Sequence, residues 1–331
     1  MEERIVFTEE LDLKHMNFIT ALSARDLYVD PLVERAEVDE RIYITGADVS
    51  TGGKLGEFKK KHPERYIDLG IAEANQVGVS AGLALEGKIV YLQGFGPFLA
   101  LRALDQVHTD IAYMNLPVRI INTHSGLTSG GGPTHYNLMD LGVMRMLPNM
   151  VDIAPSDAKQ CIKAIKATFD YPGPVCIRIA RGAEPLVYTT EDYEFEVGKG
   201  ITCIDGTDIT VIGTGSTVAF AVSAANGLAK EGISVRVIDM HTLRPLDKEL
   251  IIKAAKETGA IVTAEDHLID GGLGSAVAET LADAGIGIPF KRLGIANDKF
   301  PPLGDCYELY EYFGYNPEGI KKAVRDLLKN K

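Results

Sequence analysis

Short apolar runs rich in β-branched residues alternate with longer helix-like runs along most of this chain, and no other feature restricts its fold as strongly. In the first part the strand-like runs lie at 41–47, 66–69, 88–92, 118–122, 151–154 and 175–179. Helix-like stretches occupy 24–35, 73–85, 98–112 and 157–169. The alternation returns at 208–212, 234–238 and 260–263, with helices over 218–230 and 247–258. This pattern is typical of α/β folds, so we expect two mostly parallel sheets flanked by helices.

A change in composition after residue 182 divides the chain into two parts. Residues 189–199 are polar and acidic, as in a linker, and the second alternating segment begins near Gly200. We therefore predict one domain over 1–190 and a smaller one over 191–331, which suits a chain of 331 residues. The polar, irregular segment before about Leu22 predicts an arm that lies on a neighbouring subunit.

Composition and charge argue against several classes of partner. Hydrophobic residues at 46% and charged residues at 24% describe a globular protein, and a net charge of −12 argues against nucleic acid and anionic membranes. No apolar run approaches the ~18 residues that cross a bilayer. The start lacks the features of a signal peptide, which predicts a cytoplasmic protein. Four scattered cysteines show no metal-ligand spacing, so we expect buried thiols and no metal site: Cys161, Cys176, Cys203 and Cys306.

Three loops between the expected strands and helices carry unusual residues. Glu73 opens a helix after a glycine turn, residues 93–98 include Phe95 and Phe98, and residues 122–135 read Asn-Thr-His-Ser-Gly-Leu-Thr-Ser-Gly-Gly-Gly-Pro-Thr-His. Taken alone, a glutamate at a helix start complements the helix dipole, and two phenylalanines can belong to the core. Loops at the strand ends of a parallel sheet surround a ligand crevice, so we expect these three to meet at one site.

In this order and spacing the three segments resemble the pyrimidine-binding domain of transketolase. The resemblance continues through residues 211–216, 241–246 and 264–275, and it covers nearly the whole chain from about Arg25. It implies thiamin diphosphate as the coenzyme and the transfer of a two-carbon ketol unit between sugars. Full-length members also carry an N-terminal domain that binds the coenzyme diphosphate through Mg²⁺, with a Gly-Asp-Gly followed by an Asn-rich stretch.

No such Gly-Asp-Gly arrangement occurs in this sequence. The resemblance therefore implies the C-terminal half of a split transketolase, active only with an N-terminal partner subunit that holds most of the Mg²⁺ ligands. Sites in this family form between two chains and closed two-fold symmetry is common, so we expect a heterotetramer of two plus two.

The resemblance also implies roles in coenzyme binding. Glu73 matches the catalytic glutamate that hydrogen-bonds a ring nitrogen of the aminopyrimidine and shares the proton that activates the coenzyme. Phe98 and Phe95 match a pair of aromatic positions at that ring, with Phe98 as the expected stacking partner. Asp48 matches an aspartate near the thiazolium, although an aspartate at a strand end is also a common turn former.

Further matches concern the substrate. Arg25, His124 and Arg181 match positions that bind the terminal phosphate of the sugar, and an arginine fork suits a phosphate or a sulfonate. For Arg25 a surface ion pair is the alternative, and Arg178 is the alternative to Arg181 but is more typical of a structural residue. His135 matches the histidine that contacts the carbonyl and hydroxyl oxygens of the donor sugar, so we expect it to act in binding and catalysis.

Three glycines depart from the family pattern. Gly130 and Gly131 stand where transketolases usually carry an acidic pair, the second member of which contacts the acceptor, and Gly52 replaces a serine that touches phosphate. We expect Gly52 and Gly131 still to line the substrate site. Because lost polar partners change selectivity, the departures predict a branched or ketose acceptor, or a sulfonated sugar, in a roomier and less polar pocket.

Other functions stay open. A 1-deoxyxylulose-5-phosphate synthase shares residues 105–107 and 155–157 but normally carries its N-terminal domain in the same chain, and a 2-oxoacid dehydrogenase beta subunit lacks the Gly-Pro-Thr-His at 132–135. A catalytically silent partner subunit is opposed by the intact Glu73 and its aromatic pair. The turn at 213–216 has two glycines but not the full dinucleotide fingerprint, so it predicts packing between elements.

Overall fold

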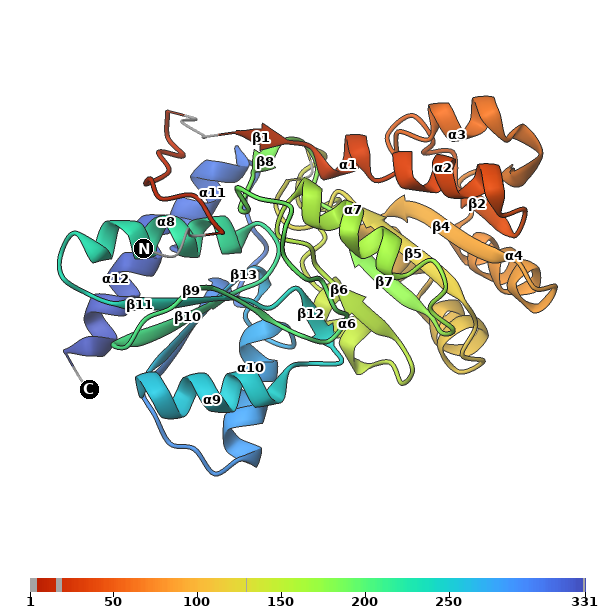
Figure 1. Ribbon diagram of the computed structural model, residues 1–331. Helices are drawn as coiled ribbons and strands as arrows, with labels where there is room; N and C mark the ends of the chain where they lie inside the picture. The colour runs from red at the N-terminus through yellow and green to blue at the C-terminus, as the bar shows by residue number, and fades with distance from the viewer. Residues whose placement is uncertain (1–4, 16–19, 129, 330) are drawn as a thin grey trace.

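The computed structural model describes residues 5–15, 20–128, 130–329 and 331, and it contains two main sheets covered by helices on both faces (Figure 1). The first has seven strands in the order β12-β6-β7-β5-β4-β2-β3, and the second has five in the order β14-β13-β10-β11-β9. Most neighbouring strands run parallel. The expected α/β class, with two sheets flanked by helices, is confirmed.

The inner strands of the first sheet are buried on both faces, as helix-covered parallel strands must be, whereas its edge strand β3 is partly exposed. Its strands are β2 (Ile42–Gly46), β3 (Tyr66–Asp68), β4 (Ile89–Phe95), β5 (Val118–Thr123), β6 (Val151–Ile153), β7 (Val175–Arg178) and β12 (Thr242–Arg244). One face packs against α2 (Asp30–Val38), α3 (Gly56–Lys61) and α7 (Ala158–Ala167). The other face packs against α4 (Glu73–Leu85), η2 (Phe98–Arg102), η3 (Val107–Ala112) and α6 (Asp140–Met146).

The helix expected over 98–112 is divided into wide turns. Between η2 and η3 lies the short α5 (Leu104–Gln106), and both η2 and η3 are π-helical. The amide of Ala103 donates to the carbonyl of Phe98 at 3.1 Å, and that of Tyr113 donates to His108 at 2.8 Å, each five residues back. Turns of this kind are rare and are frequent at functional sites.

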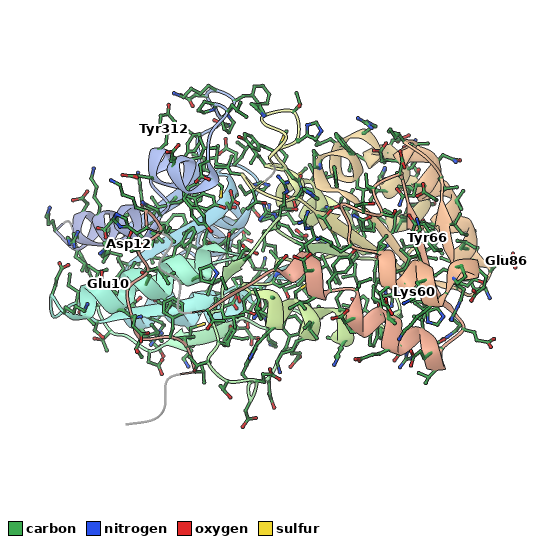
Figure 2. The ribbon with its side chains drawn as sticks, turned by 90° about the horizontal axis from the view of Figure 1, so that it is seen from above. Glu10, Asp12, Lys60, Tyr66, Glu86 and Tyr312 are labelled. Carbon is green, nitrogen blue, oxygen red and sulfur yellow. The ribbon has the colours of Figure 1, made fainter. Side chains whose placement is uncertain are left out.

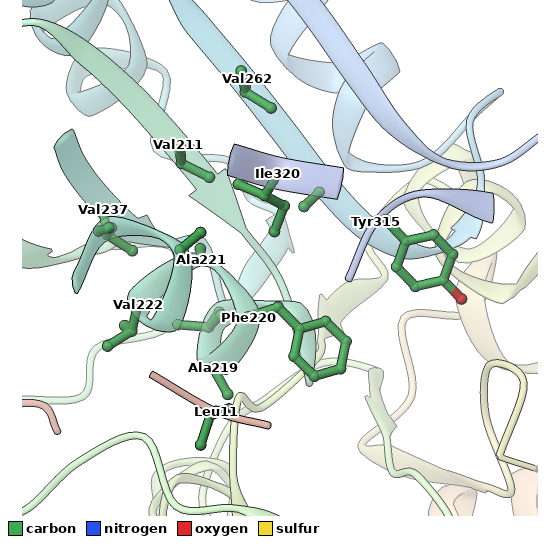
Figure 3. Packing of buried hydrophobic residues seen from close by; sticks show 14 of the residues in the cluster. Leu11, Val211, Ala219, Phe220, Ala221, Val222, Val237, Val262, Tyr315 and Ile320 are labelled. Atoms are coloured by element: carbon green, nitrogen blue, oxygen red, sulfur yellow. The ribbon is translucent and has the colours of Figure 1, made fainter. Parts of the chain in front are cut away.

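The second sheet has four parallel strands and one antiparallel edge. They are β10 (Ile209–Gly213), β11 (Val235–Asp239), β13 (Ile261–Leu268), β14 (Phe290–Ile295) and the edge strand β9 (Ile201–Ile204). On one face lie α8 (Thr217–Ala229), α11 (Cys306–Phe313) and α12 (Pro317–Leu328), and on the other lie α9 (Lys248–Thr258) and α10 (Leu273–Asp283). Figure 3 shows the strand residue Val211 near Ile320 of α12, and Phe220 of α8 belongs to the same buried cluster. Almost every residue of α8 is buried.

The beginning of the chain lies on the second sheet's helices, in the same subunit. Leu11 donates its amide to the Ser223 hydroxyl at 2.8 Å, and the Asn226 side chain donates to the carbonyl of Phe7 at 3.1 Å. Val6, Phe7 and Leu11 are buried there, and Glu10 and Asp12 lie beside these helices in Figure 2. The expected arm on a neighbouring subunit is therefore wrong for residues 5–13, because their apolar side chains are already buried against α8. Residues 16–19 lie outside the described residues.

Two segments cross the expected domain boundary between residues 190 and 191. The boundary itself stays a prediction. The first is residues 5–13. The second is β12, which leaves the later part of the chain and pairs antiparallel with β6, Thr242 opposite Ile153. The short β1 (Ala21–Leu22) and β8 (Glu184–Pro185) pair antiparallel nearby.

Within the described residues, the four cysteines are free; Cys161, Cys176 and Cys203 are buried and Cys306 is half-buried. This part of the chain contains no group of three or more histidine, cysteine or acidic side chains arranged to hold a metal ion. Nor does any of its helices combine the length and apolarity needed to cross a membrane.

Candidate active site

The site residues expected from the sequence gather along the carboxyl edge of the first sheet. Phe95 ends β4, His124 directly follows β5, and Arg181 comes three residues after β7, while Glu73 begins α4. Because β4, β5 and β7 are parallel neighbours in the sheet, their carboxyl ends lie side by side. This edge is where open α/β sheets bind ligands.

Four aromatic rings form a row that joins two of the loops. The ring of Phe95 lies 4.0 Å from that of His124 and 6.2 Å from that of Phe98, centroid to centroid. Phe98 in turn meets His135 edge-on at 5.3 Å. Both phenylalanines are only partly buried, so neither is an ordinary core residue. The row brings residues 93–98 and the long loop at 122–135 together.

Glu73 is buried although it begins a helix. Its side chain is 4% exposed, and its Oε2 accepts a hydrogen bond of 2.8 Å from Nη1 of Arg102, whose side chain is 51% exposed. The guanidinium carbon of Arg102 also lies 4.3 Å from the centroid of the Phe98 ring. Glu73 therefore does more than complement a helix dipole. Arg102 was missed in the sequence, where its position four residues after Phe98 was the available signal.

His124 is held in a defined tautomer by its neighbours. Its Nε2 lies 3.2 Å from Nη1 of Arg25, a group that can only donate, and its Nδ1 lies 3.1 Å from the Thr123 hydroxyl. The ring must therefore accept at Nε2 and carry its proton on Nδ1. Its backbone has a positive φ of 61°, which is uncommon for a residue with a side chain and is found at functional sites.

The surroundings of His124 are electropositive. Burial first, and then the charges of Arg25, Arg181 and His135, lower the pKa of His124 to about 4. Arg25 contacts His124, while the neighbouring Asp26 pairs with Lys54 at 2.8 Å. The surface ion pair that was the alternative role for Arg25 is thus formed by Asp26 and Lys54 instead. The cluster can receive an anion.

The three unusual glycines each lie against a predicted site residue. A Cβ on Gly52 would be 3.1 Å from the ring of Phe95, and one on Gly131 would be 2.6 Å from Cγ of His135. A Cβ on Gly130 would overlap the guanidinium of Arg181. The space left by these glycines is therefore filled by neighbouring side chains. At Gly130 the neighbouring group is a cation, the guanidinium of Arg181, and the expected change in pocket size stays a prediction.

Asp48 lies at the rim of the site. It is exposed, has a positive φ of 56°, and donates its amide to the carboxyl of Asp68 at 2.9 Å. Across the described residues, no hydrogen bond or ion pair joins the Asp48 side chain to the row of rings. The structure thus groups the predicted residues around Phe95 and Phe98 and leaves Asp48 beside them.

Arg178 belongs to the junction of the two parts of the chain. It is buried, its Nε donates to both carboxyl oxygens of Asp140 at 3.0 and 3.2 Å, and its Nη2 donates to the carbonyl of Asp266 at 2.6 Å. Close packing also explains the two-glycine turn, where a Cβ on Gly213 would be 3.0 Å from the backbone of Val218. Both features are structural, as expected.

Comparison with known proteins gives the family. The model described as "Transketolase, pyrimidine binding domain" matches residues 20–185, and "Transketolase, C-terminal domain" matches residues 198–320. The chain is 40% identical to a subunit of the apulose-4-phosphate transketolase of Phocaeicola vulgatus, over 93% of this chain and 98% of that protein. It is 38% identical to the 6-deoxy-6-sulfo-D-fructose transketolase subunit SqwH of a Clostridium species, over 93% of this chain and 95% of that one.

A solved structure gives the same result. The chain matches one described as "Split gene transketolase, inactive beta4 tetramer" with a TM-score of 0.86 and 38% identity, over 93% of this chain and 99% of that one. The sequence matches and the structural match cover both parts of the chain. This chain belongs to the transketolase family and aligns along its length with subunits of split transketolases.

Proposed function

We propose that the chain is the C-terminal subunit of a thiamin diphosphate-dependent transketolase, active with an N-terminal partner subunit. The observation that carries the proposal is the buried carboxyl of Glu73 beside the partly buried ring of Phe98, at the same sheet edge as the histidine and arginine cluster. The partner would hold the diphosphate and Mg²⁺ of the coenzyme. A heterotetramer of two plus two and a cytoplasmic location stay predictions.

The side chains at this edge suit an aminopyrimidine ring. Phe98 offers an aromatic face, and offset stacking adds about 0.5–1.5 kcal/mol beyond burial. Glu73 offers a carboxyl group, which can hold a proton at a ring nitrogen. When bound, thiamin diphosphate supplies the reactive carbon that takes up the ketol unit. The protein's task is to hold the ring, keep the Glu73 carboxyl group against it and exclude water.

The electropositive cluster suits the anionic end of a sugar. Arg25 and Arg181 provide guanidinium groups that bind a phosphate or a sulfonate, and neutral His124 provides a further polar contact. His135 contacts the Phe98 ring, and its charge acts on His124, so it is near enough to both to meet the sugar oxygens beside the coenzyme. Asp48 would line the thiazolium side.

The acceptor is proposed to differ from the ordinary pentose phosphate. At Gly130, where an acidic residue is usual in the family, the guanidinium of Arg181 fills the space. Gly131 replaces the acidic residue that contacts the acceptor in the family, so a hydroxyl of the acceptor has no carboxylate to donate to. The cation beside Gly130 favours an acceptor with an anionic or oxygen-rich group. The relatives named for apulose 4-phosphate and for 6-deoxy-6-sulfofructose support a branched or a sulfonated sugar.

The function is tested by mixing this chain with its N-terminal partner and titrating thiamin diphosphate by calorimetry. We expect binding by the mixture and weaker or no binding by either chain alone, because the site needs both. Glu73→Ala should abolish binding, whereas Glu86→Ala, at the exposed far end of α4, should not change it. A mixture that does not bind thiamin diphosphate would contradict the proposal. Efficient turnover of xylulose 5-phosphate with ribose 5-phosphate would contradict the altered specificity.

A pH effect follows from His124. Its pKa of about 4 lies below the ordinary value of 6.5, so it is neutral in the folded protein at neutral pH. An anion bound against it stabilises the protonated ring and raises that pKa. We therefore expect uptake of a proton on binding of the anionic substrate between pH ~4 and ~6.5. Calorimetry at pH 5.5 in buffers of different ionisation enthalpy measures this uptake.

The control for proton uptake is His124→Asn, which cannot be protonated and should bind the same substrate without it. Equal uptake by the variant would show that another group takes the proton.

Protein stability changes over the same pH range. As the pH falls from about 6.5 to about 4, His124 takes up a proton in the unfolded chain but not yet in the folded protein. The free energy of unfolding therefore decreases over this range.

A further inference from the structure

Arg102 occupies the surface on which the proposed function places the aminopyrimidine ring. Its guanidinium carbon lies 4.3 Å from the centroid of Phe98, and its Nη1 donates to Oε2 of Glu73 at 2.8 Å. One side chain therefore covers the aromatic face and binds the carboxyl group together. These are the two contacts that the coenzyme ring requires.

The local backbone explains this placement. η2 is a π-helical segment in which the amide of Ala103 bonds to the carbonyl of Phe98, five residues back. Arg102, four residues after Phe98, is thereby returned to the same side of the segment. A guanidinium at 4.3 Å over a ring leaves no room for a second ring stacked on that face.

The charges favour this arrangement when no other ligand is present. Glu73 is 4% exposed, and a buried carboxylate without a cation or donor is costly. Arg102 neutralises it and adds a cation–π contact with Phe98. Yet half of the Arg102 side chain is exposed, so rotation about its side-chain bonds can carry the guanidinium into solvent without disturbing the core.

We propose that Arg102 occupies the place of the aminopyrimidine ring when the coenzyme is not bound. Its guanidinium holds Glu73 and Phe98 in place and must leave before the coenzyme ring can bind. The inference rests on the proposed function, since it takes the coenzyme site as given. Coenzyme binding is then a competition in which the ring displaces the guanidinium. The competing contact weakens the affinity of the assembled enzyme for thiamin diphosphate.

The test is the dissociation constant of thiamin diphosphate for the assembled two-subunit protein, measured by calorimetry with Arg102→Ala. Removal of the competing cation should tighten binding by about threefold or more, given the usual strength of an exposed cation–π contact. Arg102→Lys keeps the charge and should bind more like the unaltered protein. The matched control is Lys88→Ala, which removes a cation 5.3 Å from the ring of Tyr43 at the opposite end of β4.

Two results would overturn the inference. If Arg102→Ala weakens coenzyme binding, the guanidinium stays at Glu73 in the complex and positions it. If the variant binds as the unaltered protein does, Arg102 does not compete. A thermal unfolding curve checks that the variant is folded, and Arg102→Gln serves if it is not. Failure of the unaltered complex to bind the coenzyme, by contrast, counts against the proposed function itself.

Discussion

Glu73→Gln should lower the kcat of the reconstituted enzyme by about 10²- to 10⁴-fold, the usual contribution of proton transfer by a positioned side chain. Glutamine has nearly the same shape and can donate a hydrogen bond from its amide, but it cannot share a proton with a ring nitrogen. Coenzyme binding should therefore change much less than turnover. Steady-state kinetics at saturating thiamin diphosphate measure the effect.

The matched control is Glu86→Gln at the other end of α4, where the side chain is exposed and lies at the far end of the first sheet's helices (Figure 2). It should leave kcat unchanged. Because Arg102 would lose its carboxylate partner in Glu73→Gln, a thermal unfolding curve should accompany the kinetics. Turnover by Glu73→Gln within a few-fold of the unaltered enzyme would remove this residue from the chemistry.

Arg178→Leu should lower the free energy of unfolding by about 3–5 kcal/mol, because it leaves buried carboxylates without their cation. Arg178 is bound to Asp140 through Nε, and its charge opposes the rise that burial causes in the pKa of Asp152 and of Asp266. Denaturant titration at pH 7 measures the loss. Because the buried acids can take up protons, the deficit should shrink at pH 5.

Arg181→Leu is the control for Arg178→Leu, since Arg181 is exposed and surface changes usually stay within about 0.5 kcal/mol. It should instead weaken the binding of the anionic substrate. Combining Arg178→Leu with Asp140→Asn should recover part of the lost stability, because the unpaired charge is removed with its partner. A double variant no more stable than Arg178→Leu would show that the cost comes from packing alone.

The sheets could be predicted because parallel strands are buried on both faces and their sequences are continuously apolar. β10 is an example: it reads Ile-Thr-Val-Ile-Gly, and all five residues are buried. β12 could not be predicted, because its three residues are held by pairing with β6, some ninety positions earlier, and such pairing leaves no local pattern. The position of residues 5–13 was missed for the same reason. Phe7 and Leu11 are buried by a helix that lies far away in the sequence, so no local pattern reveals their place.

In the site, Phe95, Phe98 and His124 lie at one sheet edge because they end or follow strands, and Glu73 begins the helix that follows β3; their roles stay predictions. The sequence motif could not predict contacts between side chains. Arg102 reaches Glu73 from a π-helical segment, where hydrophobic periodicity predicts a regular helix, and the pair lies 29 positions apart in the sequence. The glycine at 130 was taken as open space, whereas a guanidinium from 51 positions later fills it.

The attachment of residues 5–13 to α8 has a consequence for synthesis on the ribosome. Leu11 bonds to Ser223, 212 positions further along, so residues 5–13 leave the ribosome well before their docking surface on α8 has been made. At a translation speed of about 5–20 residues per second, the wait is roughly 10–40 s. During that interval the apolar side chains of residues 5–13 are exposed to chaperones and proteases, and their docking on α8 comes late in assembly.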